Sequence, residues 1–343
     1  MGRRPEVSDR PRVAVVSLGG TIASAPMEGT GKASPTLSAS AISASVPGLS
    51  DLADLELTDL ARIPSIDVSF DLARRVDAAA REAHDRGCRG MVVTQGTDTI
   101  EEMSFAVDLL NDGDMPIAFV GAMRHAGLAG ADGPANLLDA VRTVCSNDAR
   151  GLGCLVVMNE EVHSARAVRK LHTSSPAAFR SPGVGPVGWI VEGVPHLRDR
   201  PFARIVIGIG PDATIVRPPV VKITFDDDGW WLPRIRETET PGLVLEAMGG
   251  GHVPSWIATE LAPMAQRIPI VLTSRTGEGE VLQSTYGGFP GSETMLLEAG
   301  LIPAGSLDSL KARIALALLL TSQASRARIA SVFSELGSPA RRT

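Results

Sequence analysis

The residues best suited to chemistry in this sequence are Thr97 and Asp98, within the segment MVVTQGTDTIEE. The apolar run Met91 to Val93 predicts a buried strand, and Glu101 and Glu102 indicate that a helix follows it. A hydroxyl and a carboxylate therefore stand where a strand ends, which is where open parallel sheets bind ligands. The local alternative is that the pair caps the helix, because threonine and aspartate are common N-cap residues.

A second threonine follows a glycine-rich turn near the start of the chain. The first strand ends VVSLGGTIAS, and Gly19 and Gly20 permit a sharp turn that exposes the hydroxyl of Thr21. A structural turn residue is the alternative reading of Thr21. The G-x-G-x-x-G and Walker patterns are absent, so the sequence predicts no nucleotide cofactor and no cofactor of another kind.

Two strand ends of one parallel sheet could place Thr21 and Thr97 on opposite walls of a single crevice. A hydroxyl attacks a carbonyl carbon when a neighbouring base removes its proton, and a lysine made neutral by burial can do so. Lys170, in SARAVRKLHTSS, is the candidate in a chain with few lysines and many arginines. The alternative is that Lys170 is an ordinary surface charge.

The elements that must position these residues form an α/β pattern, in which short apolar runs alternate with amphipathic helical segments. We expect a larger N-terminal domain with a mainly parallel sheet and crossover helices, and a smaller C-terminal α/β domain. A stretch rich in proline, glycine and arginine separates them, which predicts a catalytic domain over residues 1–200, a linker over 201–219 and the smaller domain over 220–343. The expected elements of the first domain are strands at 13–18, 91–94, 117–120 and 155–158 and helices at 70–85, 99–110 and 132–145. Those of the second are strands at 220–225, 242–247 and 268–273 and helices at 254–266, 293–298, 307–322 and 325–336.

The bulk composition narrows the range of partners. With 343 residues, 44% of them hydrophobic, and a net charge of -6, the chain offers no basic face for nucleic acid. No apolar stretch approaches the length of a membrane helix, and the N-terminal segment lacks an export cleavage pattern. Three scattered cysteines indicate reduced thiols, so we expect a soluble, cytoplasmic protein. The histidines show no ligand spacing, and no metal is predicted.

Five motifs in order resemble the bacterial L-asparaginase and glutaminase family, and the similarity runs through nearly the whole chain. The motifs are LGGTIA, QGTDTIEE, VGAMR followed by ADGPANLLDAV, the lysine segment ending in AAF, and GLIPAGSLDSLKAR. The resemblance implies hydrolysis of the side-chain amide of L-asparagine, and of L-glutamine in many members. The reaction uses a threonine nucleophile and an acyl-enzyme intermediate, and it releases ammonia.

The resemblance also implies residue roles. Thr21 is similar to the nucleophile, and Thr97, Asp98 and Lys170 to the group that faces it. The implied substrate-binding residues are Gly20, Ser65, Gly96, Thr97, Asp98, His252 and Glu293. Among them, Ser65 would bind the substrate α-carboxylate and Asp98 its ammonium group. Glu293 lies eighteen residues before Lys311 of LKAR, the spacing at which relatives place a glutamate that reaches a neighbouring subunit's site. Its alternative role is that of an acid in a first helical turn.

The sequence departs from the family pattern at three places. Gln95 stands where most members have histidine, and His252, in MGGGHVP, replaces an asparagine. The segment from Pro26 to Pro35 contains no tyrosine, although many relatives have one there that contacts the nucleophile. Tyr286 is too distant in sequence to fill that place. A different residue or water would then activate Thr21, or Thr97 with Lys170 would carry the first step, or turnover would be poor.

The leading interpretation is an asparaginase that acts on a small-molecule amino acid and assembles as a homotetramer, a dimer of dimers. One alternative is a catalytically weak protein that binds or senses amino acids, which would bind aspartate or asparagine without releasing ammonia. Another is an amidotransferase subunit that supplies ammonia to a tRNA-bound substrate, which the acidic composition disfavours.

Overall fold

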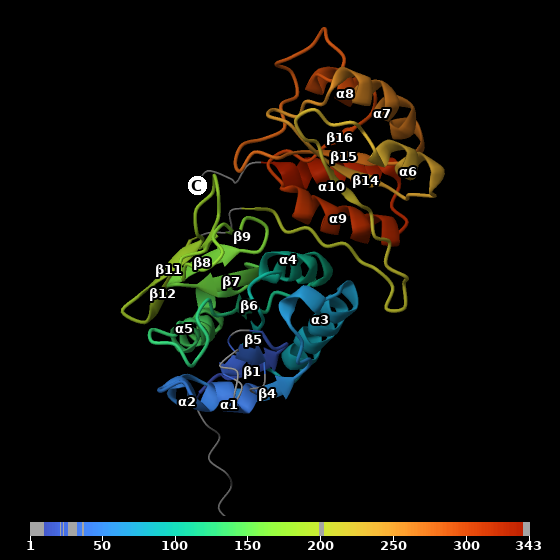
Figure 1. The fold of residues 1–343 in the computed structure, drawn as a ribbon. Helices are drawn as coiled ribbons and strands as arrows, with labels where there is room; N and C mark the ends of the chain where they lie inside the picture. Colours follow the sequence, from blue (N-terminus) through green and yellow to red (C-terminus); the bar gives the residue numbers. More distant parts are fainter. Residues whose placement is uncertain are drawn as a thin grey trace, which may run out of the picture. The chain divides into compact units, whose positions relative to one another are not determined.

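The computed structural model describes residues 10–20, 22, 24–26, 33–35, 38–198 and 202–338 (Figure 1). The chain divides into two compact units, Met1–Arg200 and Pro201–Thr343. Within the described residues, no helix is both long enough and apolar enough to cross a membrane.

The first unit is built on an eight-stranded, mainly parallel sheet with the strand order β12-β11-β8-β7-β6-β5-β1-β4. The strands from β7 to β4 run parallel to their neighbours, and β8, β11 and β12 extend the sheet in antiparallel fashion. Their bounds are β1 Arg12–Ser17, β4 Asp54–Asp59, β5 Gly90–Thr94, β6 Ile117–Val120, β7 Cys154–Met158, β8 Glu161–Ser164, β11 Gly188–Val191 and β12 Val194–Leu197. The predicted fold class is confirmed.

Helices cover both faces of this sheet, which explains why its central strands are continuous apolar runs without alternation. Both β5 and β7 are buried along their whole length. The helices α5 (Gly133–Cys145) and α2 (Leu49–Leu52) pack on one face, and α3 (Phe70–Asp85) and α4 (Ile100–Leu110) lie on the other (Figure 1). A short helix, α1 (Ala39–Ala44), packs beside β4.

The order of the strands reverses at β1. The chain passes from β1 to β4 on one side and then to β5 on the other, so the segments that follow these three strands diverge from one point. In open α/β sheets this topological switch point opens the crevice in which ligands bind. The segments that meet there carry Gly20 after β1, Ser65 after β4, and Gly96 and Thr97 after β5.

Two short antiparallel hairpins and two 3-10 helices also lie in the first unit. A hairpin forms from β9 (Arg169–Lys170) and β10 (Phe179–Arg180), and a second from β2 (Ser24–Pro26) and β3 (Ala33–Pro35). The turn after β4 is the 3-10 helix η2 (Ser65–Asp67), and η3 (Asn147–Ala149) follows α5. Lys170 thus lies in a two-residue strand.

The second unit is a smaller α/β unit with a fully parallel four-stranded sheet of order β13-β14-β15-β16. Its core packs α7 residues such as Ile257 and Leu261 against β14 and β15. No helix or strand occurs in residues 202–219. The bounds are β13 Val220–Lys222, β14 Leu243–Ala247, β15 Ile270–Ser274, β16 Ile302–Pro303, α6 Trp231–Glu237, α7 Ser255–Arg267, α8 Glu293–Glu298, α9 Ser309–Thr321 and α10 Arg326–Gly337.

Candidate active site

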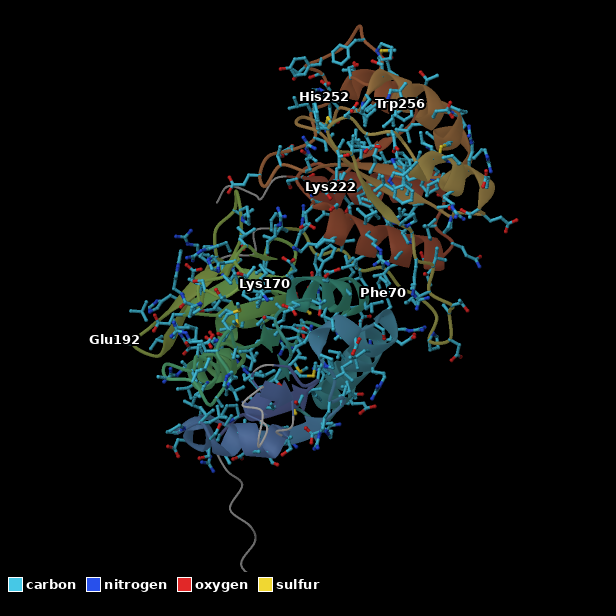
Figure 2. All side chains as sticks on the ribbon, in the orientation of Figure 1. Phe70, Lys170, Glu192, Lys222, His252 and Trp256 are labelled. Carbon is cyan, nitrogen blue, oxygen red and sulfur yellow. The ribbon has the colours of Figure 1, made fainter. Side chains whose placement is uncertain are left out.

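Thr97, Asp98 and Lys170 meet at the switch point of the first unit. The Lys170 Nζ donates to Thr97 Oγ1 at 2.8 Å and to Asp98 Oδ1 at 2.6 Å. The Lys170 side chain, labelled in Figure 2, is 14% exposed, whereas that of Asp98 is 60% exposed. The arrangement joins a hydroxyl, an ammonium and a carboxylate, and it leaves the carboxylate accessible to a charged ligand.

The local capping interpretation of Thr97 and Asp98 is not what the structure shows. The N-cap of α4 is Thr99, and its side chain makes no capping hydrogen bond. Thr99 Oγ1 instead donates to the Ser65 carbonyl at 2.7 Å and accepts from Gln95 Nε2 at 3.0 Å. Gln95 therefore serves as a buried hydrogen-bond donor that ties the end of β5 to the segment after β4.

Gly20, Gly96 and Ser65, which follow β1, β5 and β4, lie in close contact with one another. A Cβ on Gly20 would lie 2.0 Å from the Gly96 nitrogen, and one on Gly96 would lie 2.8 Å from Ser65 Oγ. Gly20 also has a φ of 85°, in the left-handed region that favours glycine. These approaches require glycine at both positions and bring Ser65, a buried residue, to the same place.

Thr21 follows Gly20 directly in the chain, but it lies outside the described residues. Its role as nucleophile stays a prediction. The segment expected to carry the activating tyrosine also falls largely outside them, so the residue that would replace this tyrosine is equally untested.

Asp132, the N-cap residue of α5, and Asn136, in the first turns of that helix, form hydrogen bonds with two neighbouring segments. Asp132 accepts hydrogen bonds from the backbone N–H groups of Met123 and Arg124, in the segment after β6. Asn136 Nδ2 donates to Asp132, and Asn136 Oδ1 accepts from the Asn159 N–H. Together they fix the segments that follow β6 and β7, a function with no short-range sequence signal.

Glu101 was predicted only as an acid at the start of the helix, yet it contacts the lysine segment. Glu101 Oε2 accepts the backbone N–H of Lys170 at 2.8 Å. The two residues are far apart in sequence, so no local pattern could have revealed this contact.

In the second unit, the structure brings together the predicted residues Glu293 and His252. Glu293 is fully buried, and its Oε2 lies 3.0 Å from His252 Nε2. Its Oε1 accepts the N–H groups of Thr285 at 2.9 Å and Tyr286 at 2.6 Å. Burial acts to raise the pKa of the Glu293 carboxyl, but the hydrogen bonds from Tyr286, its own backbone and His252 outweigh it and hold the pKa below its usual value. Figure 2 labels His252.

Other reactive side chains of the described residues form no second centre. Cys88, Cys145 and Cys154 are free thiols. Across the described ranges, no group of three or more histidine, cysteine, aspartate or glutamate side chains is placed to hold a metal ion.

The fold and the site define a class: a two-unit α/β protein with a hydroxyl, ammonium and carboxylate cluster at the switch point of a parallel sheet. Comparison with known families assigns both units. Residues 12–202 match the family described as "Asparaginase, N-terminal", and residues 219–333 match "Glutaminase/Asparaginase C-terminal domain". The chain therefore belongs to the asparaginase family.

Relatives of known name agree with this assignment along nearly the full chain. The "Probable L-asparaginase" of Deinococcus radiodurans is 35% identical over 95% of this chain and 98% of its own. The "Glutaminase-asparaginase" of Acinetobacter glutaminasificans is 30% identical over 94% of this chain and 98% of its own. A solved structure of the "Probable Cytoplasmic L-asparaginase" of Campylobacter jejuni aligns with a TM-score of 0.85 and 27% identity, and the alignment covers 95% of this chain and 100% of that one.

Proposed function

We propose that this protein is an asparaginase that hydrolyses the side-chain amide of L-asparagine to L-aspartate and ammonia. The observation that carries the proposal is the placement of Lys170 Nζ on both Thr97 Oγ1 and Asp98 Oδ1 at the switch point of the sheet. The family assignment and the relatives named L-asparaginase support the same activity.

In the proposed mechanism, the Thr21 hydroxyl attacks the amide carbon and its proton passes to the amide nitrogen. The C–N bond of the resulting tetrahedral adduct then breaks, so that ammonia leaves and an acyl-enzyme ester remains. Water then attacks the ester carbon and returns the proton to Thr21, which releases aspartate. Thr97 and Lys170 support these proton movements, because Lys170 Nζ already holds the Thr97 hydroxyl in a fixed orientation. Backbone N–H groups at the glycine turn after β1 would stabilise the oxyanion.

The substrate clamp combines an anion and a neutral donor. The exposed carboxylate of Asp98 would bind the substrate ammonium, and the Ser65 hydroxyl would bind its α-carboxylate. We also propose that Glu293 and His252 complete the site of a neighbouring subunit in a homotetramer. Within the second unit, Glu293 and His252 are already hydrogen-bonded to each other, and the centroid of the His252 ring lies 5.1 Å from that of Tyr286.

We place the catalytic group in residues 1–200, with a linker over 201–219 and the smaller domain over 220–343. The cytoplasm is the proposed compartment, which three free cysteines and the Campylobacter jejuni relative support. Glutamine is a proposed second substrate, since one relative is named glutaminase-asparaginase and one extra methylene shifts binding by only about 1–3 kcal/mol.

The test is an ammonia-release assay with asparagine and with glutamine. We expect steady release by the wild type and losses of about 10²- to 10⁴-fold in Thr21→Ala, Thr97→Val and Lys170→Met, as for removal of acid-base groups. Lys222→Met is the matched control, because Lys222 is an exposed lysine of the second unit that pairs with Glu246.

Acid quenching followed by peptide mapping identifies the acylated threonine. A mass increase on Thr97 instead of Thr21 would reassign the nucleophile. Full activity in both threonine variants would refute the mechanism. Binding of aspartate in a calorimeter with no ammonia from either amide would favour the amino-acid sensor.

A further inference from the structure

The lysine of the candidate site is held by its backbone as well as by its side chain. The Lys170 N–H donates to Glu101 Oε2 at 2.8 Å, while the next residue, Leu171, donates its N–H to the Ala178 carbonyl of the β9–β10 hairpin. The backbone N–H of Leu171 is therefore hydrogen-bonded within the hairpin, whereas the backbone N–H of Lys170 is hydrogen-bonded to a side chain of α4.

Three contacts from one short segment converge on Lys170. The side chains of Thr97 and Asp98 accept hydrogen bonds from its ammonium group. Glu101, in the first turn of α4, accepts a hydrogen bond from its backbone N–H. Lysine has a long, flexible side chain, so its ammonium is placed reproducibly only when the backbone is also fixed. The strand β9 has two residues and pairs with a strand of two, which by itself is a weak anchor.

A first-turn acid that merely favours the helix dipole would remain in solvent. Glu101 is instead 9% exposed, and its carboxylate reaches a strand 69 residues further along the chain. Glu102 occupies the same turn and has the same charge, which makes it a matched comparison for the dipole effect.

We propose that Glu101 is a positioning residue, whose carboxylate fixes the backbone of Lys170 so that the ammonium group stays on Thr97 Oγ1 and Asp98 Oδ1. For its kinetic consequence this inference rests on the proposed asparaginase activity. Displacement of a catalytic group by about 1 Å costs on the order of 10²-fold in rate.

The kinetic test compares Glu101→Met, which keeps the side-chain length without an acceptor, with Glu101→Gln, which keeps an acceptor oxygen, and with Glu102→Met. We expect Glu101→Met to lower kcat for asparagine by about 10- to 100-fold with KM little changed, because the substrate clamp is untouched. Glu101→Gln should restore most of the rate, and Glu102→Met should match the wild type. Equal losses in the two methionine variants, a parallel rise of KM, or a Glu101→Met protein that melts far below the wild type would each overturn the proposal.

A spectroscopic test needs no turnover, so it separates this inference from the proposed function. The four lysines of the chain are Lys32, Lys170, Lys222 and Lys311. Their ¹⁵Nζ ammonium signals are therefore few enough to resolve. Lys170→Arg assigns the signal of Lys170. We expect that signal to be sharp in the wild type, broadened by solvent exchange in Glu101→Met and retained in Glu102→Met. An unchanged signal in Glu101→Met overturns the proposal, whether or not the wild type releases ammonia.

Discussion

Acidification should destabilise the first unit through His163, a fully buried residue of β8. Its Nδ1 lies 3.0 Å from Ser181 Oγ, and its Nε2 lies 3.3 Å from Glu161 Oε2, which also accepts from Arg180 at 2.8 Å. Burial of the ring lowers the pKa of His163 to about 4, and the Arg180 charge acts in the same direction. These two effects outweigh the attraction of Glu161, so the folded protein holds the ring neutral.

The sign of the effect follows from proton uptake. Between pH 6.5 and pH 4 the histidine is protonated in the unfolded chain, where its pKa is about 6.5, but stays neutral in the folded chain. The free energy of unfolding therefore falls as the pH falls through this window. With a folded pKa of about 4, the loss between pH 7 and pH 5 is about 2 kcal/mol. That is a sizeable part of the roughly 5–15 kcal/mol of a typical domain.

The assay is urea unfolding of the wild type and of His163→Asn, whose amide can still pair with Ser181. Trp189 is the one tryptophan of residues 1–200, so its emission reports on the first unit once the tryptophans at 230, 231 and 256 are replaced by phenylalanine. At pH 7 the variant should be less stable because it leaves a cavity, and by pH 5 that difference should shrink by about 2 kcal/mol. A difference in unfolding free energy that is equal at the two pH values would refute the reasoning.

Three further predictions follow from contacts already described. Gly20→Ala should abolish ammonia release and lower the melting temperature, because its Cβ would lie 2.0 Å from the Gly96 nitrogen at a φ of 85°. Asp132→Ala should lower the free energy of unfolding by about 1–3 kcal/mol in urea titrations, since two backbone donors lose their acceptor. Asp132→Asn keeps one acceptor oxygen and should therefore lose less stability than Asp132→Ala. Glu293→Gln should be less stable than the wild type at neutral pH, and this gap in melting temperature should close below pH 4.5, because the stabilisation from a lowered carboxyl pKa disappears as the carboxylate is protonated.

The sequence predicted the parallel core of the first unit well because burial on both faces leaves a clear signal. The strand Ile117–Val120 and the helix Phe70–Asp85 have the predicted bounds, and β1, β5 and β7 differ from theirs by one residue at one or both ends. The parallel edge strand β4 was missed, because it is only partly buried and therefore lacks this signal. Ser69 caps α3 by accepting the Leu72 N–H, which is a common local signal of a helix start.

The antiparallel extension and the lysine hairpin were missed for a physical reason. A two-residue strand such as β9 has no periodicity to detect, and its identity depends on β10 and on contacts with α4. The same limit applies to His252 and Glu293, whose contact spans 41 residues. Sequence could nominate both residues through a resemblance, but it could not pair them.

The segment from Gln95 to Glu101 shows how this site gives up local stability for long-range contacts. A side-chain cap contributes about 1 kcal/mol to a helix, yet no side chain caps α4. Thr99 bridges Gln95 to the Ser65 backbone, and Thr97, Asp98 and Glu101 each accept a hydrogen bond from Lys170. Side chains that could cap α4 instead bond to a distant strand. Such departures from local helix-capping preferences are expected at functional sites, where the geometry of the site matters more than the stability of one helix. The same residues that could have begun an ordinary helix therefore hold the lysine in place.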